Sequence, residues 1–185
     1  MPMLSQQKPN KTKSVSKTAS SKSVAESAAG KDDAIILLKE DHKEVSRLFE
    51  RFEATKSPSM KQQLVAKICA ALTVHAQIEE EIFYPAARDA LKTDDENLID
   101  EAEVEHDTIK QFVAELEGAP TDADFYDARV KVLGEYVKHH VQDEETEMFP
   151  KLRKTKMDMG AIGEELATRK NELTDVSQKN EATHV

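Results

Sequence analysis

The stretch HAQIEEEIFYP at residues 75–85 has a second copy in HVQDEETEMFP at residues 140–150. Both copies place a glutamate four residues after a histidine, His75 with Glu79 and His140 with Glu144. On an α-helix this spacing puts the two side chains about 40° apart on one face. Imidazole and carboxylate presented together are ligands for first-row transition metals. The duplication therefore predicts helices that carry two matching sets of metal ligands.

Each copy is preceded by a further histidine. His42 lies 33 residues before His75, and His106 lies 34 residues before His140. Both of these earlier histidines directly follow an acidic residue. The pattern is a duplicated helix pair with four histidines and two glutamates. A dinuclear metal site in a helix bundle is built with this kind of symmetry.

The size and composition of the chain fit one small domain with tails. Its 185 residues are 38% hydrophobic, which supports a modest core. Its single cysteine excludes an internal disulfide framework and fits a reducing compartment. No run approaches the roughly 18 apolar residues that cross a bilayer, and the N-terminus lacks an apolar signal segment. We therefore expect a soluble cytoplasmic protein with no membrane partner.

Charge divides the chain into a basic tail and an acidic remainder. Residues 1–31 hold six Lys and one Glu, whereas the whole chain has a net charge of −10. We expect this Ser- and Lys-rich segment to be a disordered tail. It serves either as a solubilising tail or as a contact for nucleic acid or acidic surfaces. The net charge argues against nucleic-acid binding by the rest of the chain.

From residue 32 onward the pattern is helical, and no alternating stretch is long enough for a strand. Helix-start and helix-stop residues divide it into four helices. The expected boundaries are Asp32-Asp33 to about Ala54, Ser57-Pro58 to about Pro85, Asp94-Asp95 to a stop at Gly118-Ala-Pro120, and Thr121-Asp122 to about Pro150 or slightly beyond. Short connections favour an all-α, up-down-up-down four-helix bundle over residues 32–156. Residues 157–185 form a C-terminal extension with a short amphipathic helix and a tail.

Each expected helix has an apolar stripe at three- and four-residue steps, as packed antiparallel helices require. The stripes are Ile35, Leu38, His42, Val45, Phe49, Phe52; Val65, Ile68, Leu72, His75, Glu79, Ile82; Ile99, Ala102, His106, Ile109, Val113, Leu116; and Tyr126, Val130, Leu133, Val137, His140, Glu144, Met148. Six polar residues interrupt them: His42, His75, Glu79, His106, His140 and Glu144.

These six residues favour a metal site over an ordinary core. Any one of the histidines taken alone is better explained as a hydrogen-bonded core residue. Two buried carboxylates, however, are costly unless they are paired or bind a cation. The stripes contain no Lys or Arg to pair with them. Divalent cations would neutralise the charge.

Several neighbouring residues receive more modest roles. His139 is about 100° round the helix from His140 and is expected to be exposed. Glu80 and Glu145 recur in both copies, and we expect them to contact solvent or neighbouring side chains, with a role in supporting the ligands as the alternative. Cys69 is expected to be a small buried hydrophobic residue.

The ligand types narrow the choice of metal. A closed zinc site normally includes several cysteines, and calcium and magnesium prefer oxygen ligands. Mixed imidazole and carboxylate suits iron or manganese, and iron is favoured for gas chemistry. We assign His42 and His75 to one ion, His106 and His140 to the other, and Glu79 and Glu144 as bridges. Six side chains leave positions open for an oxo or hydroxo bridge and for O₂, NO or peroxide.

The motifs DHKEVSRLFERFE, HAQIEEEIFYPAARDAL, EAEVEHDTIKQFVAEL and HHVQDEETEMFPKL, over roughly residues 34–154, resemble the hemerythrin family in its bacterial HHE cation-binding branch. The resemblance implies an up-down bundle around a non-haem centre of two iron ions. Oxygen-carrying hemerythrins have a fifth histidine in a His-xxx-His pair, whereas Ala102 and Lys110 flank His106 here. The two His-xxx-Glu units resemble iron-centre repair proteins instead, without their Cys-containing N-terminal domain.

Three functions fit these observations. The first is a diiron protein that binds or senses O₂, NO or peroxide in the oxidative or nitrosative stress response. The second is an enzyme that reduces NO or disproportionates peroxide, with Tyr84, Tyr136 or Glu80 as candidate proton sources. The third is an iron-handling or interaction module in which the metal mainly stabilises the fold.

Overall fold

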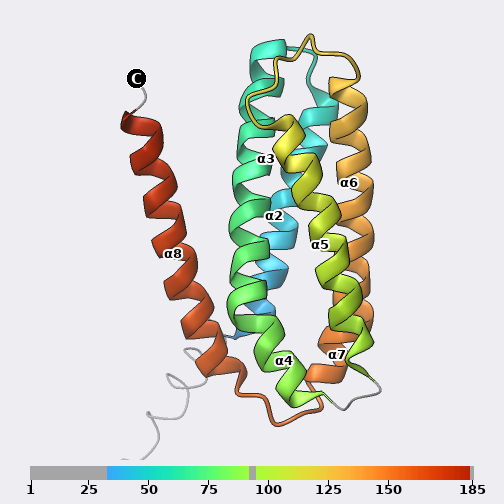
Figure 1. The fold of residues 1–185 in the computed structure, drawn as a ribbon, viewed down its shortest axis with the longest axis vertical. Coiled ribbons are helices and arrows are strands. Elements are labelled where there is room, and N and C mark those ends of the chain that lie inside the picture. The colour runs from blue at the N-terminus through green and yellow to red at the C-terminus, as the bar shows by residue number, and fades with distance from the viewer. Residues whose placement is uncertain (1–32, 92–94, 184–185) are drawn as a thin grey trace, which may run out of the picture.

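Four long antiparallel helices form the body of the protein (Figure 1). They are α2 (Ala34–Ala54), α3 (Pro58–Ile78), α5 (Asn97–Leu116) and α6 (Tyr126–Asp143). This computed structural model describes residues 33–91 and 95–183. The all-α, up-down-up-down bundle predicted from the sequence is confirmed, and the predicted N-terminal tail lies outside the described residues. Within those residues, no helix combines the length and hydropathy needed to cross a membrane.

The starts of the first two helices agree with the capping signals in the sequence. The Asp33 carboxylate accepts a hydrogen bond from the Ile36 amide at 3.1 Å, and the Ser57 hydroxyl accepts one from the Met60 amide at 3.4 Å. Such contacts satisfy backbone N–H groups that have no partner within the helix. Pro58 occupies the first turn of α3, where its missing N–H costs nothing.

The other two predicted starts are wrong by a few residues. The third helix begins at Asn97 instead of Asp94-Asp95, although residue 94 lies outside the described part of the chain. The fourth begins at Tyr126 instead of Thr121-Asp122. Phe125, directly before it, has a left-handed backbone with φ of 64°. An α-helix cannot include that conformation, so the residues before it form a turn.

A π-helical segment directly follows α3 and another directly follows α6, at the same place in each repeat. The segments are η1 (Glu79–Phe83) and η3 (Glu144–Met148), followed by α4 (Tyr84–Ala90) and α7 (Phe149–Leu152). The amide of Tyr84 donates to the Glu79 carbonyl, five residues back. Pro85 lacks an N–H and would clash with a carbonyl four residues back, so the helix widens before it. The second helix therefore continues to Ala90, and the prediction that it ends near Pro85 is wrong.

The apolar core lies in two parts along the bundle axis. One cluster includes Val45, Leu72 and Ile109 and lies away from α4 and α7. The other includes Leu38 and Phe83 and lies at the end of the bundle formed by α4 and α7. The predicted stripes form this core, since all of their residues are buried except the half-buried Phe49 and Ile82. The six polar stripe residues lie between the two clusters, where the surrounding packing fixes their positions.

Helix α8 (Met159–Thr183) packs on the outside of the bundle. It has 25 residues, so the prediction of a short C-terminal helix is wrong. It contacts α2, α3 and η1, and its C-terminal end diverges from the bundle (Figure 1). Leu166 is fully buried, Arg169 pairs with Glu81 at 2.7 Å, and Lys170 pairs with Asp41. The contacts give α8 a specific docking position.

Truncating the buried anchor of α8 is expected to weaken the fold. Leu166→Ala should lower the free energy of unfolding by about 3 kcal/mol, because it leaves a cavity at a fully buried position. Val176→Ala on the same helix is the control, since Val176 is 56% exposed and should change stability by less than about 0.5 kcal/mol. Urea denaturation monitored by circular dichroism measures both. Equal unfolding midpoints would contradict the docking of α8.

Candidate metal centre

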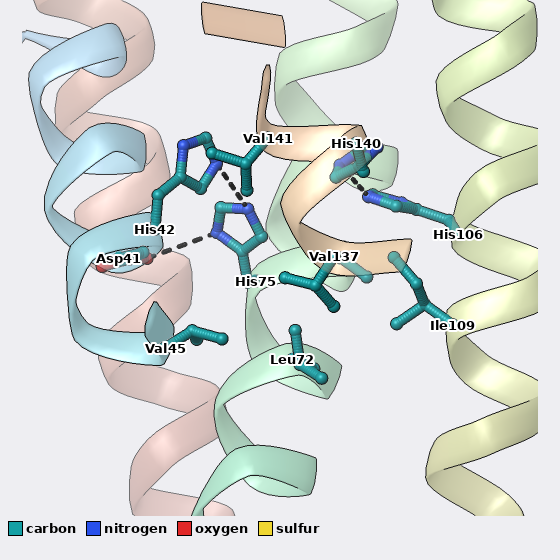
Figure 2. A pocket seen from close by; sticks show the side chains of 11 residues that line it. Asp41, His42, Val45, Leu72, His75, His106, Ile109, Val137, His140 and Val141 are labelled. Carbon is teal, nitrogen blue, oxygen red and sulfur yellow. Dashed lines mark hydrogen bonds and ion pairs between the residues drawn. The ribbon is translucent and has the colours of Figure 1, made fainter. Parts of the chain in front are cut away.

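Two pairs of imidazoles face each other across the middle of the bundle (Figure 2). His42 of α2 and His75 of α3 form one pair, with their Nε2 atoms 3.1 Å apart. His106 of α5 and His140 of α6 form the other, also with Nε2 atoms 3.1 Å apart. All four side chains are buried. Each of the four long helices therefore contributes one imidazole.

Two carboxylates link these pairs. Glu79 and Glu144 are the first residues of η1 and η3 and are 0% and 1% exposed. Oε2 of Glu79 lies 3.2 Å from His75 Nε2 and 3.4 Å from His106 Nε2. Oε2 of Glu144 lies 3.2 Å from His42 Nε2 and 3.7 Å from His140 Nε2. Each carboxylate thus reaches one imidazole of each pair, and all six predicted residues meet in one cluster.

The donor set fits divalent cations. When two nitrogens bind the same cation at about 2.1 Å, with an N–metal–N angle near 90°, the nitrogens lie about 3 Å from each other. The Nε2 atoms of both imidazole pairs have this separation. Both oxygens of Glu79 and Oε2 of Glu144 are buried and make no hydrogen bond of good geometry among the described residues, although an imidazole Nε2 lies 3.2 Å from each Oε2. Such groups destabilise a fold unless a ligand satisfies them. Cations between the pairs would satisfy these oxygens.

The charges in the cluster are strongly coupled. Burial, together with Glu144, raises the pKa of the Glu79 carboxyl well above its usual range. Burial also acts on Glu144, but His140 and His42 outweigh it and lower its pKa to about 2. Burial lowers the pKa of His42, yet Glu144, Glu79 and Glu145 raise it more, to about 9. Protons thus balance the charge in the metal-free protein, and bound cations would displace them.

A second layer of carboxylates holds the outer nitrogens of the imidazoles. Nδ1 lies within hydrogen-bond distance of a carboxylate in three of them: His42 with Glu145 (3.0 Å), His106 with Glu80 (2.9 Å) and His140 with Glu105 (2.9 Å). Asp41 lies further from His75 Nδ1, at 3.6 Å, and forms an ion-pair contact without a hydrogen bond. A carboxylate on Nδ1 keeps the proton there and leaves Nε2 free to bind a metal. Glu80 and Glu145 contact neighbouring side chains as expected, Lys110 and Lys39, and their contacts with His106 and His42 fit the alternative role in supporting the ligands.

Asp41 and Glu105 were not assigned a role from the sequence, although each directly precedes a predicted ligand. A residue one step round a helix from His42 points elsewhere, so only the packing of α2 against α3 shows that Asp41 meets His75. Three of the outer carboxylates also pair with lysines: Glu145 with Lys39, Asp41 with Lys170, and Glu80 with Lys110. His139 is exposed and Cys69 is buried, as predicted.

Neutralising one outer carboxylate is expected to weaken metal binding without removing a ligand. Glu80→Gln should reduce cation affinity about 10- to 100-fold, because an amide holds the His106 ring less firmly in the required tautomer. Glu81→Gln is the matched control, since that carboxylate pairs with Arg169. Competition with a metallochromic chelator measures both affinities. The supporting role of Glu80 is wrong if the two variants bind equally well.

Tyr84 adds a hydroxyl to the cluster. Its side chain is buried, and the hydroxyl donates a hydrogen bond to Glu144 Oε1 at 3.0 Å and lies 3.3 Å from His106 Nε2. Burial, with the negative charge of Glu144 and Glu79, raises its pKa well above the usual value. Tyr84 therefore keeps its proton and acts as a hydrogen-bond donor. Of the other proton-source candidates, Tyr136 is 46% exposed and Glu80 holds His106.

A four-helix bundle that buries four imidazoles and two carboxylates around one point defines a cation-binding helical protein. Residues 33–152 match the family model of the hemerythrin HHE cation binding domain. This match covers more than half of the chain, which therefore belongs to the hemerythrin HHE family. The family resemblance seen in the sequence is confirmed.

Two similar proteins add to this result. A hemerythrin HHE cation binding domain-containing protein from Mycobacterium kansasii has a solved structure with a TM-score of 0.66 and 22% identity, covering 80% of this chain and 90% of its own. That likeness shows the fold. A DNA nickase from Nostoc sp. strain PCC 7120 is 29% identical over 118 residues, which are 63% of this chain. The chain spans about a third of the length of that curated relative.

Proposed function

We propose that the chain is a non-haem diiron protein that binds or senses O₂, NO or peroxide, with a role in the oxidative or nitrosative stress response. The observation that carries this proposal is the crossed arrangement of the carboxylates. Glu79 reaches His75 and His106, and Glu144 reaches His42 and His140. Carboxylates that each serve both imidazole pairs are suited to bridge two cations. The mixed nitrogen and oxygen donors favour iron or manganese over zinc or calcium.

The six residues would hold two cations and leave room for a further ligand. His42 and His75 would hold one, His106 and His140 the other, and Glu79 and Glu144 would bridge them. Six side chains do not complete two octahedral shells, so a pair of iron ions would supply redox-active open positions for a small molecule. The outer carboxylates orient the rings, and apolar clusters pack on both sides of the six residues.

A small apolar cavity opens onto the imidazoles and supports a gaseous ligand. Besides the four histidines and Asp41, its lining is apolar: Val45, Leu72, Ala76, Ile109, Val137 and Val141 (Figure 2). Its volume is about 10 Å³, close to the room needed by one water-sized molecule. Apolar walls disfavour charged ligands and retain a diatomic gas. Larger substrates would not fit without movement of the core.

The test is the optical response of iron-loaded protein. Anaerobic loading with Fe(II), followed by O₂, NO or hydrogen peroxide, should produce new absorption bands with at least one of the three. Val137→Leu narrows the cavity and leaves the six ligands intact, so it should keep its iron and respond more weakly. A loaded wild-type protein with an unchanged spectrum after all three additions would refute the proposal.

Turnover of NO or peroxide is a second candidate function, favoured by the position of Tyr84. Disproportionation of peroxide transfers protons between two peroxide molecules, and reduction of NO by an added electron donor consumes protons; the Tyr84 hydroxyl is a buried donor within the cluster. The Glu144 carboxylate orients this hydroxyl. Such a donor is needed for repeated turnover and has no role in a module in which metal only stabilises the fold.

Tyr84→Phe separates binding from turnover. If turnover occurs, the variant should consume peroxide or NO at least about tenfold more slowly, because it has lost a positioned proton donor. Its iron content should stay at the wild-type level, since Tyr84 is not among the proposed ligands. Steady-state consumption measured with an electrode, together with iron analysis, checks both. Equal rates in wild type and variant would exclude this role of Tyr84.

DNA nicking is not part of this proposal. The chain spans about a third of the nickase, and its net charge of −10 repels a phosphate backbone.

A cytoplasmic location is part of the proposal because the single cysteine fits a reducing compartment. An iron-handling role would use the same centre, and loss of iron to an acceptor without any gas response would favour it.

A further inference from the structure

A pocket between α5 and the end of α6 has surface carboxylates at one end and the buried cluster at the other. Exposed Glu101 and Glu147 and half-buried Glu105 and Asp143 line its outer part. His140 and Glu144, which are 2% and 1% exposed, line its inner part. Its volume is about 50 Å³, enough for a partly hydrated ion. No Lys or Arg is among its lining residues.

The buried Glu144 carboxylate lines the inner end of this pocket. Its Oε2 makes no hydrogen bond of good geometry among the residues that the structure describes, although His42 Nε2 lies 3.2 Å away. A buried carboxylate oxygen at the end of an acidic pocket attracts a positive ion and repels an anion. The pocket is therefore suited to cations, unlike the apolar cavity on the other side of the imidazoles.

A separate group of potential ligands, His139, Glu105 and Asp143, lies beside the mouth; Glu105 and Asp143 also line the pocket, and His139 lines an adjoining surface pocket. Nδ1 of His139 is 3.0 Å from Asp143 Oδ2 and 3.6 Å from Glu105 Oε1. The three residues bring one ligand atom each within 4.8 Å of one another. The His139 side chain is 67% exposed, so an ion can reach it directly from solvent. One nitrogen with two carboxylates selects a transition-metal cation over sodium or potassium.

Glu105 joins the mouth to the buried centre. Its Oε1 faces His139, while its Oε2 accepts from His140 Nδ1 at 2.9 Å. One carboxylate thus belongs both to the exposed group and to the layer that orients a buried imidazole. Only the Glu105 side chain therefore separates an ion held by this group from His140 of the proposed His106–His140 site.

We propose that His139, Asp143 and Glu105 capture a divalent transition-metal cation, which then enters the buried centre through the pocket lined by Glu101 and Glu147. This inference rests on the proposed metal centre and adds its loading route. The capture site binds weakly because it is exposed and has three ligands. The acidic mouth raises the local cation concentration and speeds entry, and salt screens this effect.

The rate of Co²⁺ uptake by the full-length, metal-free protein tests the route, because visible absorption of Co²⁺ reports filling of the buried site. Asp143→Asn/Glu147→Gln removes two charges at the mouth and none of the six proposed ligands. Glu164→Gln/Glu165→Gln, at exposed positions of α8 away from the pockets that reach the histidines, removes the same charge and is the control. At low ionic strength we expect the mouth variant to fill the buried site about tenfold more slowly than the control and to reach the same final occupancy of that site.

The salt dependence of the loading rate and the loading rate of a His139 variant complete the test. The wild-type rate should fall with added salt, and the rate of the mouth variant should fall much less. His139→Ala should also slow loading, because it removes the only nitrogen of the capture site. Equal rates in the mouth variant and the control would overturn the route while leaving the metal centre intact. A wild-type protein that takes up no Co²⁺ would overturn both.

Discussion

Removing bound cations is expected to lower the Tm of the wild-type protein by roughly 10 °C or more. The proposed site takes one imidazole from each of α2, α3, α5 and α6, so a bound cation links helices that are distant in sequence. Free cation at 1,000 times its Kd stabilises the folded state by about 4 kcal/mol. In a domain of this size, each kcal/mol shifts Tm by about 2–4 °C. Differential scanning calorimetry with and without a chelator measures the change.

The control for this prediction is a variant that lacks a proposed ligand. His75→Ala should show the same Tm with and without chelator, because its cation affinity is already lost. A nonspecific effect of the chelator would shift both proteins equally. A wild-type Tm that does not respond to chelation or to added Fe(II), Mn(II) or Co(II) would contradict cation binding in the core.

Replacing Glu144 by Ala is expected to reduce cation affinity at least about a hundredfold. The change removes the oxygen that lies 3.2 Å from His42 Nε2 and 3.7 Å from His140 Nε2, and with it one of the two proposed bridges. The change also removes the carboxylate that His42 Nε2 and the Tyr84 hydroxyl contact, so we expect some loss of stability in the metal-free variant. Circular dichroism establishes the fold, and isothermal titration with Co²⁺ measures the affinity.

Glu135→Ala is the matched control for that experiment. It removes the same charge from an exposed position of α6, the helix that directly precedes Glu144, and should leave affinity within about twofold of wild type. Wild-type affinity in Glu144→Ala would show that this carboxylate is not a ligand. The proposed bridging arrangement would then be wrong.

The sequence predicts the inner part of the site well because helix periodicity determines which residues face inward. His42, His75, His106 and His140 fall on apolar stripes, and burial of those stripes brings them together. The two His-xxx-Glu spacings place Glu79 and Glu144 beside them. The same periodicity predicts the bundle, since each stripe requires another to cover it.

The outer part of the site depends on contacts between helices that a single sequence does not show. Glu80 and Glu145 look like surface residues by periodicity, yet each meets a histidine of the other repeat. Their positions follow from the π-helical segments, which alter the helix phase after Glu79 and Glu144. The available signal was a proline six residues after each of these glutamates, Pro85 and Pro150.

The C-terminal extension shows a different limit. Helix α8 has few strongly apolar residues, and its position depends on Leu166 and on ion pairs formed by Arg169 and Lys170. Such pairs require knowledge of the bundle surface, which the periodicity of α8 alone does not provide. Its full length was therefore underestimated.

The most direct test of the central claim is Mössbauer spectroscopy, with iron analysis, of protein loaded anaerobically with ⁵⁷Fe(II) and then exposed to air. Two carboxylates shared between two imidazole pairs predict two irons per chain that are magnetically coupled. The oxidised sample should then have a diamagnetic ground state at low temperature. One iron per chain, or two uncoupled high-spin ferric ions, would contradict a bridged diiron centre formed by Glu79 and Glu144.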